Sequence, residues 1–357
     1  MIDERLPLSQ EDVRQRGWAI EARVYAEDPQ RGFLPSIGRL ACYRPPVDQD
    51  GGNQDGGDGI RVDSGVFEGA EITLYYDPMI AKLVAYGADR DSAIERLADA
   101  LDAFVIAGVQ HNVAFLAAIA ASERFRRGAL STDFIAETFP GGFGSPAVPG
   151  LDPGIVAADR VIVIAAALAE ARLHESEVAG GGRDLAAPRR LTVLLDGRPC
   201  PVSLRVEGSA CIVETEHESC LAATDWRPGH RLMHLRIEDA PATVQIERLR
   251  GRAFRLTHRG VVRLAQVLPP RAAELLLMMP PKQPADTSRL VLSPMPGLLT
   301  QIVVDEGQQV KAGEPLVVVE AMKMENVLRA ERDGRVAKLR AKPGDSLAVD
   351  QVILELE

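Results

Sequence analysis

The C-terminal part of this chain repeats a short pattern once, and this repeat restricts the possible fold more than any other feature of the sequence. Each copy reads as a glycine, a short strand, a glycine turn and an apolar strand that ends in glutamate. Two copies are too few to stack as a solenoid, so we expect them to fold together as one small, flattened all-β barrel. The matching positions are Gly297 with Gly334, Gly307 with Gly344, and Glu320 with Glu357.

A lysine lies near the midpoint of this repeat, in the turn that we expect over residues 321–326. From Glu320 to Asn326 the segment reads Glu-Ala-Met-Lys-Met-Glu-Asn, which places the lysine at Lys323. Rigid strands on both sides would hold its amine out in water, away from any base that could activate it. An amine in such a position suits the covalent attachment of a mobile group better than it suits catalysis.

Segments rich in proline and glycine divide the rest of the chain and predict three domains, over residues 1–143, 144–286 and 287–357. The middle domain begins with a helical pattern at Ile155–Val178, which seven or eight short alternating runs follow. Closely spaced strands of this kind must close on themselves or be covered. We therefore expect an antiparallel β-barrel around one long helix.

The first domain mixes the two kinds of periodicity. We expect strands at Ile72–Tyr76 and Met79–Tyr86, a helix capped by Asp91, and a second helix over Asn112–Ala121. The expected fold class of the whole chain is thus α+β with several domains.

Composition excludes several classes of function. The chain has 41 basic and 51 acidic residues, a net charge of −10, which argues against nucleic acid as a partner. No run approaches the roughly 20 apolar residues that a membrane helix needs, so no membrane contact is expected. The four cysteines are scattered, with no C-x-x-C pair and no histidine at ligand spacing. We expect no metal site, and a reduced, cytoplasmic protein.

The lysine turn carries a family resemblance. Ala321-Met322-Lys323-Met324, with the upstream Pro294-Met295-Pro296-Gly297, resembles the biotin carrier domain of biotin-dependent carboxylases. The resemblance implies biotin as a covalent cofactor on Lys323, attached by a biotin protein ligase, with the neighbouring alanine and methionines as part of the cofactor-binding segment. Lipoyl domains share the repeat but usually place aspartate before their lysine, so the methionines favour biotin.

The first domain is similar to the C-terminal subdomain of biotin carboxylase, through the segments 17–29, 32–36, 75–82 and 108–115. This resemblance implies that Arg23 stabilises the negative charge that develops on the biotin oxygen. A fixed guanidinium can offset such charge because it does not readily lose its own proton. The resemblance also implies that Asp77 lies near Arg23 and orients it. Arg23 and Asp77 are the catalytic residues that we expect.

The whole chain is most similar to the C-terminal half of an α subunit of the propionyl-CoA carboxylase type. Segments 225–229 and 279–288 carry the resemblance in the middle domain, which implies docking onto a carboxyltransferase β subunit. ATP, magnesium and bicarbonate would be used by the full enzyme, because no phosphate-binding or metal-binding motif of the ATP-grasp half occurs in this chain. Biotin on Lys323 would accept CO2 at the biotin carboxylase site and deliver it to the β subunit, and the chain alone is not expected to be active.

Three alternatives remain open at this point. The chain could belong to a 3-methylcrotonyl-CoA or an acetyl-CoA carboxylase α subunit, or it could be a biotin carrier and scaffold without a catalytic part. The sequence does not decide which acyl-CoA is used, the stoichiometry of the assembly, or whether Met1 is a native start.

Overall fold

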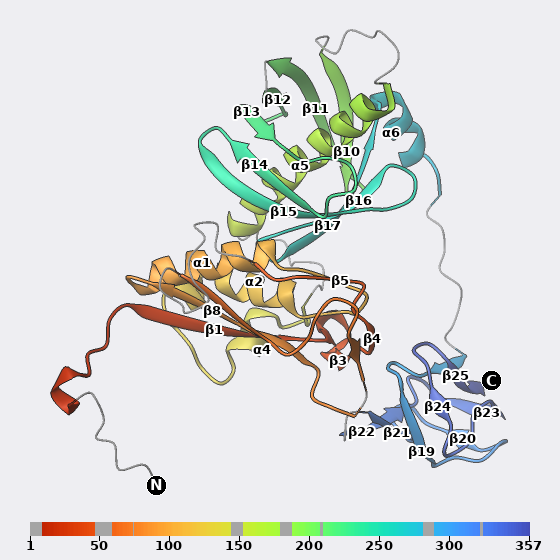
Figure 1. Ribbon diagram of the computed structural model, residues 1–357. Coiled ribbons are helices and arrows are strands. Elements are labelled where there is room, and N and C mark those ends of the chain that lie inside the picture. Colours follow the sequence, from red (N-terminus) through yellow and green to blue (C-terminus); the bar gives the residue numbers. More distant parts are fainter. Residues whose placement is uncertain are drawn as a thin grey trace.

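The computed structural model describes residues 9–46, 59–73, 75–143, 153–178, 188–207, 210–280, 289–321 and 324–357. Three separate hydrophobic clusters lie within residues 20–125, 161–267 and 291–356. The chain therefore folds as three units with a core each, here called the first unit, the barrel and the carrier unit (Figure 1). This multidomain α+β architecture is the expected one.

The first unit is built on a three-stranded antiparallel sheet in the order β1-β8-β6. Its strands are β1 (Trp18–Tyr25), β8 (Met79–Gly87) and β6 (Ile60–Ser64), and its two longer helices are α1 (Arg90–Ala103) and α2 (Val113–Ala121). Alternation along β1 buries Ala22 and Val24, while the side chain of Arg23 points to the opposite, open face. The helices cover the buried face and lie between this sheet and the barrel (Figure 1).

Short elements complete the first unit: η1 (Gln10–Asp12), β2 (Glu27–Asp28), η2 (Pro29–Arg31), β3 (Leu34–Pro35), β4 (Gly38–Arg39), β5 (Cys42–Arg44), β7 (Glu71–Ile72), β9 (Val105–Ala107), α3 (Glu123–Arg126) and α4 (Phe134–Thr138).

Two expectations for the first unit were wrong in detail. The cap of α1 is Asp89 and not Asp91, because Asp89 and Ser92 can exchange reciprocal side-chain hydrogen bonds across the first turn. An Asp91 cap would pair instead with Ile94, which has no polar side chain. The expected strand at Ile72–Tyr76 is limited to β7, which ends at Ile72. Tyr75 and Tyr76 are exposed, and residue 74 of the expected strand lies outside the described residues.

The middle unit is a closed antiparallel barrel in the order β10-β11-β12-β13-β14-β15-β16-β17, as expected. The long helix α5 (Pro153–Val178) is buried on all sides from Ile162 to Ala169, so the barrel closes around it. A helix that is apolar all round needs such an enclosure. The other elements are β10 (Arg189–Leu195), β11 (Arg198–Glu207), β12 (Ala210–Glu214), β13 (Ser219–Thr224), β14 (Leu232–Ile237), β15 (Ala240–Arg248), β16 (Ala253–His258), β17 (Val261–Leu268) and α6 (Pro270–Leu277).

The carrier unit consists of two four-stranded sheets, β18-β25-β23-β20 and β22-β21-β19-β24. The strands are β18 (Leu290–Leu292), β19 (Gly297–Ile302), β20 (Gln309–Val310), β21 (Pro315–Ala321), β22 (Met324–Arg329), β23 (Gly334–Leu339), β24 (Ser346–Leu347) and β25 (Val352–Leu356). Each half of the repeat places its short central strand in the other half's sheet. This confirms the flattened all-β barrel.

Equivalent contacts recur in the two halves of the carrier unit. The Gly307 amide donates to the Val336 carbonyl and the Gly344 amide to the Leu299 carbonyl, both at 2.7 Å. A Cβ atom added to Gly297 would lie 2.7 Å from the Glu320 carbonyl oxygen, which is too close for any other residue. Gly297 and Gly334 therefore mark close approaches between backbones, whereas Gly307 and Gly344 have positive φ angles of 87° and 96°, which favour glycine.

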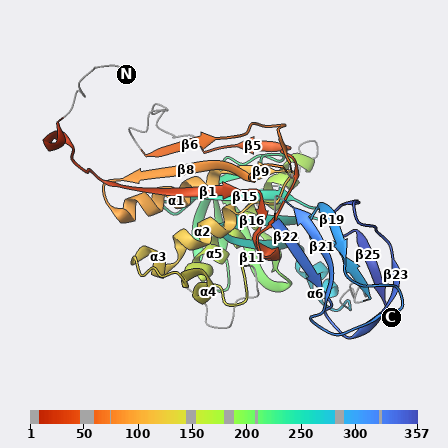
Figure 2. The ribbon, with the colours of Figure 1, turned by 90° about the horizontal axis from the view of Figure 1, so that it is seen from below.

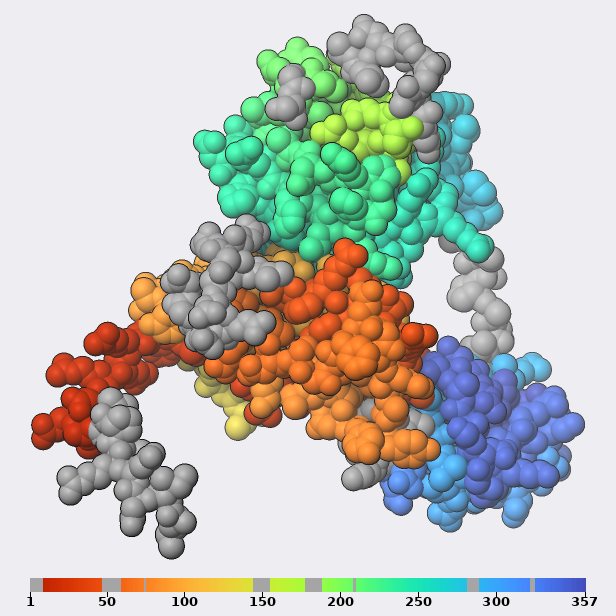
Figure 3. All heavy atoms as spheres, in the orientation of Figure 1, coloured from red at the N-terminus to blue at the C-terminus, as the bar shows by residue number. Residues whose placement is uncertain are grey.

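A buried polar junction joins the first unit to the barrel. Asp102, near the end of α1, is 3% exposed and accepts a hydrogen bond of 2.8 Å from the Arg259 amide in the β16–β17 turn. His258 Nδ1 lies 3.2 Å from the other Asp102 oxygen. Gln245 Nε2 donates to the carbonyls of Leu101 and Phe104 at the end of α1. The space-filling view shows the two units in continuous contact (Figure 3).

Candidate functional site

Arg23 lies on the open face of the β1-β8-β6 sheet. Its side chain is 59% exposed, and Nε donates a hydrogen bond of 2.9 Å to Glu21 Oε1 on the same face of β1. This hydrogen bond, followed by the neighbouring Tyr25 side chain, raises the pKa of Arg23 above its ordinary value. The same bond lowers the pKa of Glu21. Both groups are therefore charged, and the guanidinium is accessible.

Further charged side chains share this face, among them Arg61 of β6, which forms an ion pair of 3.2 Å with Asp63. The register pairs Arg23 with Lys82 of β8, and Lys82 with Asp63 of β6. Because directly paired residues point to the same face of a sheet, they form one row across the three strands. The row offers two cations and one carboxylate, and its two end residues, Arg23 and Asp63, are 59% and 51% exposed, so it is suited to an anionic or polar ligand.

Asp77 lies just before β8. Its Oδ1 accepts a hydrogen bond of 2.8 Å from the Met79 amide. Its charge is the second cause, after burial, of the raised pKa of Glu27. The ion pair that the structure gives to Arg23 is with Glu21, so an orienting contact between Asp77 and Arg23 is not seen among the described residues. The catalytic roles of Arg23 and Asp77 stay predictions.

The lysine turn is bounded by a regular hairpin. The register of β21 and β22 pairs Ala321 with Met324, so the connection consists of Met322 and Lys323 alone. These two residues lie outside the described part of the chain, and the side chain of Met324 is likewise not described. Ala321 is buried, with 3% exposure, and anchors the end of β21. The connection is therefore shorter than the expected turn over residues 321–326, because Ala321 and residues 324–326 are paired within the two strands.

The segment before β19 is fixed next to this turn. Ser293 is fully buried, and its hydroxyl donates 2.7 Å to the carbonyl of Met295. The Met295 side chain is buried and its sulfur accepts from Asn326 Nδ2 of β22 at 3.7 Å. The Pro-Met-Pro segment of the sequence is therefore a support beneath the hairpin. The sequence alone did not single out Asn326, because its partner Met295 lies 31 positions away in the chain.

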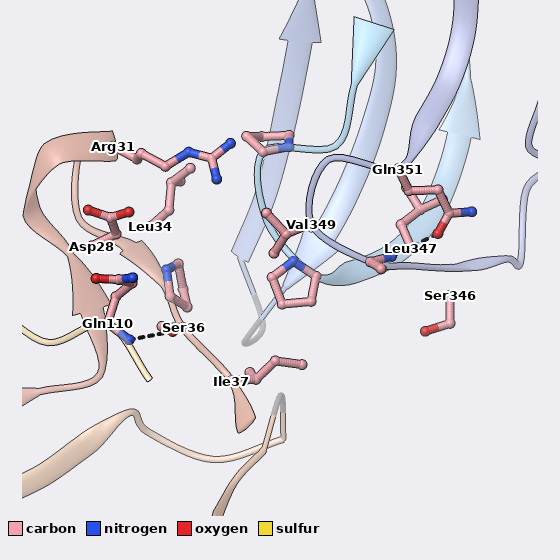
Figure 4. A pocket seen from close by; sticks show the side chains of 14 residues that line it. Asp28, Arg31, Leu34, Ser36, Ile37, Gln110, Ser346, Leu347, Val349 and Gln351 are labelled. Atoms are coloured by element: carbon pink, nitrogen blue, oxygen red, sulfur yellow. Dashed lines mark hydrogen bonds between the residues drawn. The ribbon is translucent and has the colours of Figure 1, made fainter. Parts of the chain in front are cut away.

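A cleft of about 600 Å³ separates the carrier unit from the first unit. Residues of η2 and β3 line one wall, and the Pro294–Pro296 segment and β24 line the other (Figure 4). Gly297 pairs with Leu347 of β24, and the next residue of β19 pairs with Glu320. The wall at β24 therefore belongs to the end of the carrier unit that bears the lysine turn.

One ion pair bridges the two units at this cleft. Arg31 Nη2 lies 3.2 Å from Asp350 Oδ1, with side chains 40% and 66% exposed. The view from below shows the carrier unit beside the β2–β3 region of the first unit (Figure 2). Sequence reasoning did not find this pair, and no local signal could have revealed it, because 319 positions separate the two residues.

Three family models match successive parts of the chain. They describe the biotin carboxylase C-terminal domain over residues 21–137, the propionyl-coenzyme A carboxylase BT domain over 161–282, and a biotin-requiring enzyme domain over 289–356. Each match covers one of the three structural units.

Curated relatives resemble the chain over nearly its whole length. The propionyl-CoA carboxylase alpha chain of Ruegeria pomeroyi is 42% identical over 99% of this chain and 53% of its own length. The mitochondrial propionyl-CoA carboxylase alpha chain of Mus musculus is 36% identical over 98% of this chain and 47% of its own. The methylcrotonoyl-CoA carboxylase subunit alpha of Dictyostelium discoideum is 28% identical over 94% of this chain and 48% of its own length. The chain thus spans about half the length of these relatives. None of its described helices is long and apolar enough to cross a membrane.

Proposed function

Since the chain combines these three domains and so belongs to the biotin-dependent acyl-CoA carboxylases, we propose that it is the biotin-carrying part of an α subunit of the propionyl-CoA carboxylase type. The observation that carries the proposal is the register of β21 and β22, which leaves Lys323 in a two-residue connection at one end of the carrier unit. A primary amine in that connection fits a biotinyl group, because it can form an amide while the flanking strands stay paired.

Biotin, when attached, supplies a ureido ring that can carry a carboxyl group between two reaction centres. The chain's own residues bind and position. Lys323 would hold the group, with Ala321, Met322 and Met324 forming the segment that a biotin protein ligase recognises. The long connection between the barrel and β18, of which residues 281–288 lie outside the description, joins the carrier unit to the rest of the chain.

Arg23 would act at the biotin carboxylase centre. A guanidinium stays protonated at neutral pH, so it can bind a developing oxyanion without donating its proton. The open face of the sheet leaves room for a second domain to complete the centre. We propose an ATP-grasp half as that partner, with ATP, magnesium and bicarbonate bound there. Asp77 is kept as a second, neighbouring candidate.

The barrel would dock onto a carboxyltransferase β subunit, which transfers the carboxyl group to propionyl-CoA. The similarity to propionyl-CoA carboxylase alpha chains over 98–99% of this chain supports this substrate over 3-methylcrotonyl-CoA. We retain the boundaries 1–143, 144–286 and 287–357 and a cytoplasmic location as parts of the proposal.

Intact-mass measurement after co-expression with a biotin protein ligase tests the carrier function. We expect one biotinyl group on the wild-type chain and none on Lys323→Arg, which keeps the charge. The matched control is Lys342→Arg, at an exposed lysine just before the turn at residues 343–344, and this variant should still be modified. An unmodified wild type, or a modified Lys323→Arg variant, would refute the assignment.

Co-purification separates the rival acyl-CoA classes. The chain should retain a propionyl-type β subunit and not a methylcrotonyl-type one. Adding an ATP-grasp half in trans should restore ATP-dependent carboxylation, which a purely scaffolding protein would not support.

A further inference from the structure

One edge of the strand that bears Arg23 has no strand partner. β1 is the outer strand of the β1-β8-β6 sheet, so the backbone groups that point away from β8 need other hydrogen-bond partners. Backbone groups of successive strand residues point to opposite edges of the strand. The Ala26 amide donates to the Pro78 carbonyl at 2.8 Å, on the side of β8, so the backbone groups of Tyr25 and Arg23 point to the free edge. The register with β8 also shifts between Val24 and Tyr25.

Asn112 supplies the missing partner at this point. Its Oδ1 accepts a hydrogen bond of 2.9 Å from the Tyr25 amide, and its Nδ2 donates 3.1 Å to the Arg23 carbonyl. Its own backbone amide donates 3.2 Å to the Tyr25 carbonyl. Only this orientation of the side-chain amide satisfies both neighbours, since one needs an acceptor and the other a donor.

The position of Asn112 in the chain makes this use of its side chain unusual. Asn112 is the N-cap residue of α2, where an asparagine side chain ordinarily accepts a hydrogen bond from the first turn of the helix. It makes no such bond here and is only 6% exposed. The side chain is therefore diverted from its own helix to the edge of β1.

Arg23 depends on its backbone for placement. Its side chain is largely in solvent, and its ion pair is with Glu21 of the same strand, which moves whenever β1 moves. The hydrogen bond from Asn112 Nδ2 to the Arg23 carbonyl therefore ties this residue to another element at the free edge of β1.

We propose that Asn112 is a positioning residue for Arg23, clamping the free edge of β1 so that the guanidinium is held at a fixed place on the open face. The proposal rests on the function proposed above for Arg23, but the clamp itself can be measured independently of activity.

Amide hydrogen exchange, resolved to single residues by fragmentation mass spectrometry, tests the clamp. In Asn112→Ala the Tyr25 amide should exchange about tenfold faster, because it loses the acceptor that Asn112 Oδ1 provides. The Ala26 amide, bonded to Pro78, should change less than twofold. Equal acceleration at both positions would mean general loosening of the unit and would overturn the proposal.

A second variant separates the two halves of the clamp. Asn112→Asp keeps the acceptor for the Tyr25 amide but removes the donor to the Arg23 carbonyl, so Tyr25 should stay better protected than in Asn112→Ala. The control is Ser122→Ala, which removes the hydrogen bond of 3.3 Å that Ser122 Oγ accepts from Phe125 at the N-terminus of α3. It should leave Tyr25 exchange unchanged.

Turnover links the clamp to the site. With the chain assembled with an ATP-grasp half, both Asn112 variants should lower kcat for carboxylation of the attached biotin about tenfold, while KM for ATP and bicarbonate stays within twofold. Ser122→Ala should leave kcat unchanged. If the wild type is active and the Asn112 variants have the same kcat, the positioning role of Asn112 is refuted, while the proposed function of the chain is not. An inactive wild type would instead refute the proposed function and the role that rests on it, whatever the exchange data show.

Discussion

Replacing Asp102 with alanine should uncouple the first unit from the barrel. The carboxylate is almost fully buried and takes the Arg259 amide at 2.8 Å and the His258 imidazole at 3.2 Å. Arg259 Nε also lies 3.6 Å away. Without the carboxylate, these groups of the β16–β17 turn lose an acceptor inside the junction.

The structure sets the size of the effect. Loss of hydrogen bonds to a buried charged group costs about 1.5–3 kcal/mol, and breaking a fully buried ion pair costs about 3–5 kcal/mol. His258 keeps the Thr243 carbonyl at 2.9 Å, and Arg259 keeps Asp99 at 2.5 Å. Because these partners remain, we expect Asp102→Ala to lower the free energy of unfolding by about 2–3 kcal/mol, closer to the cost of lost hydrogen bonds than to that of a broken buried ion pair. Asp102→Asn, which keeps an acceptor, should lose about 1 kcal/mol.

The two tryptophans of the chain provide the assay, since Trp18 lies in the first unit and Trp226 is buried in the barrel. In urea, single-tryptophan variants should show nearly coincident unfolding of the two units in the wild type and separated transitions in Asp102→Ala.

The control for this experiment is Asp99→Asn. Asp99 lies on the same helix and contacts the same arginine, but its side chain is 68% exposed. A surface pair of this kind contributes about 0–1 kcal/mol. If Asp102→Ala shifts the transitions no more than Asp99→Asn does, the reasoning that burial makes the junction strong is refuted.

Three other perturbations have defined outcomes. Gly260→Ala should lower the free energy of unfolding in urea by about 2–4 kcal/mol, because the added Cβ would overlap the backbone of α2. The control Gly251→Ala has a similar positive φ but open space around the added Cβ, and it should cost only about 1 kcal/mol. Burial lowers the pKa of His111 to about 4, although a hydrogen bond with the Ile106 backbone raises this pKa in part. The unfolded chain therefore binds the proton first, and stability should fall by about 2–3 kcal/mol from pH 6.5 to 4, a slope that His111→Gln should largely remove. Arg31→Glu should shift spin-label distances between the first and carrier units toward longer values, and adding Asp350→Arg should restore them; unchanged distances in the single variant would show that this pair does not hold the carrier unit.

The carrier unit was predictable because its information is local and repeated. Glycine spacing and apolar strands specify the two matching halves, and the register then fixes the turn that contains Lys323. The barrel was predictable as a class, but the sequence left seven or eight strands open, and β13 is a strand that alternation alone does not reveal. Its sequence Ser-Cys-Leu-Ala-Ala-Thr buries only Cys220 and Ala222, which are too small to give a strong periodic signal.

Contacts between distant segments could not be predicted in this way. Asp102 and Arg259 are 157 positions apart, and neither residue type is distinctive on a helix or in a turn. Asn112 was expected at the start of a helix, but the use of its side chain depends on an edge strand far away in sequence. Arg23 was found only through a family motif, because an exposed arginine on a strand carries no chemical signal of its own.

The exchange of strands within the carrier unit has a consequence for how such a unit could arise. β20 completes the sheet of β23 and β25, and β24 completes that of β19 and β21. A single copy of the repeat would therefore leave its sheet unfinished and could close only by pairing with an identical molecule about a two-fold axis. The present unit has the form of such a homodimer fused into one polypeptide, in which the β21–β22 connection that contains Lys323 joins the two copies, and its counterpart is the pairing of the end strands β18 and β25.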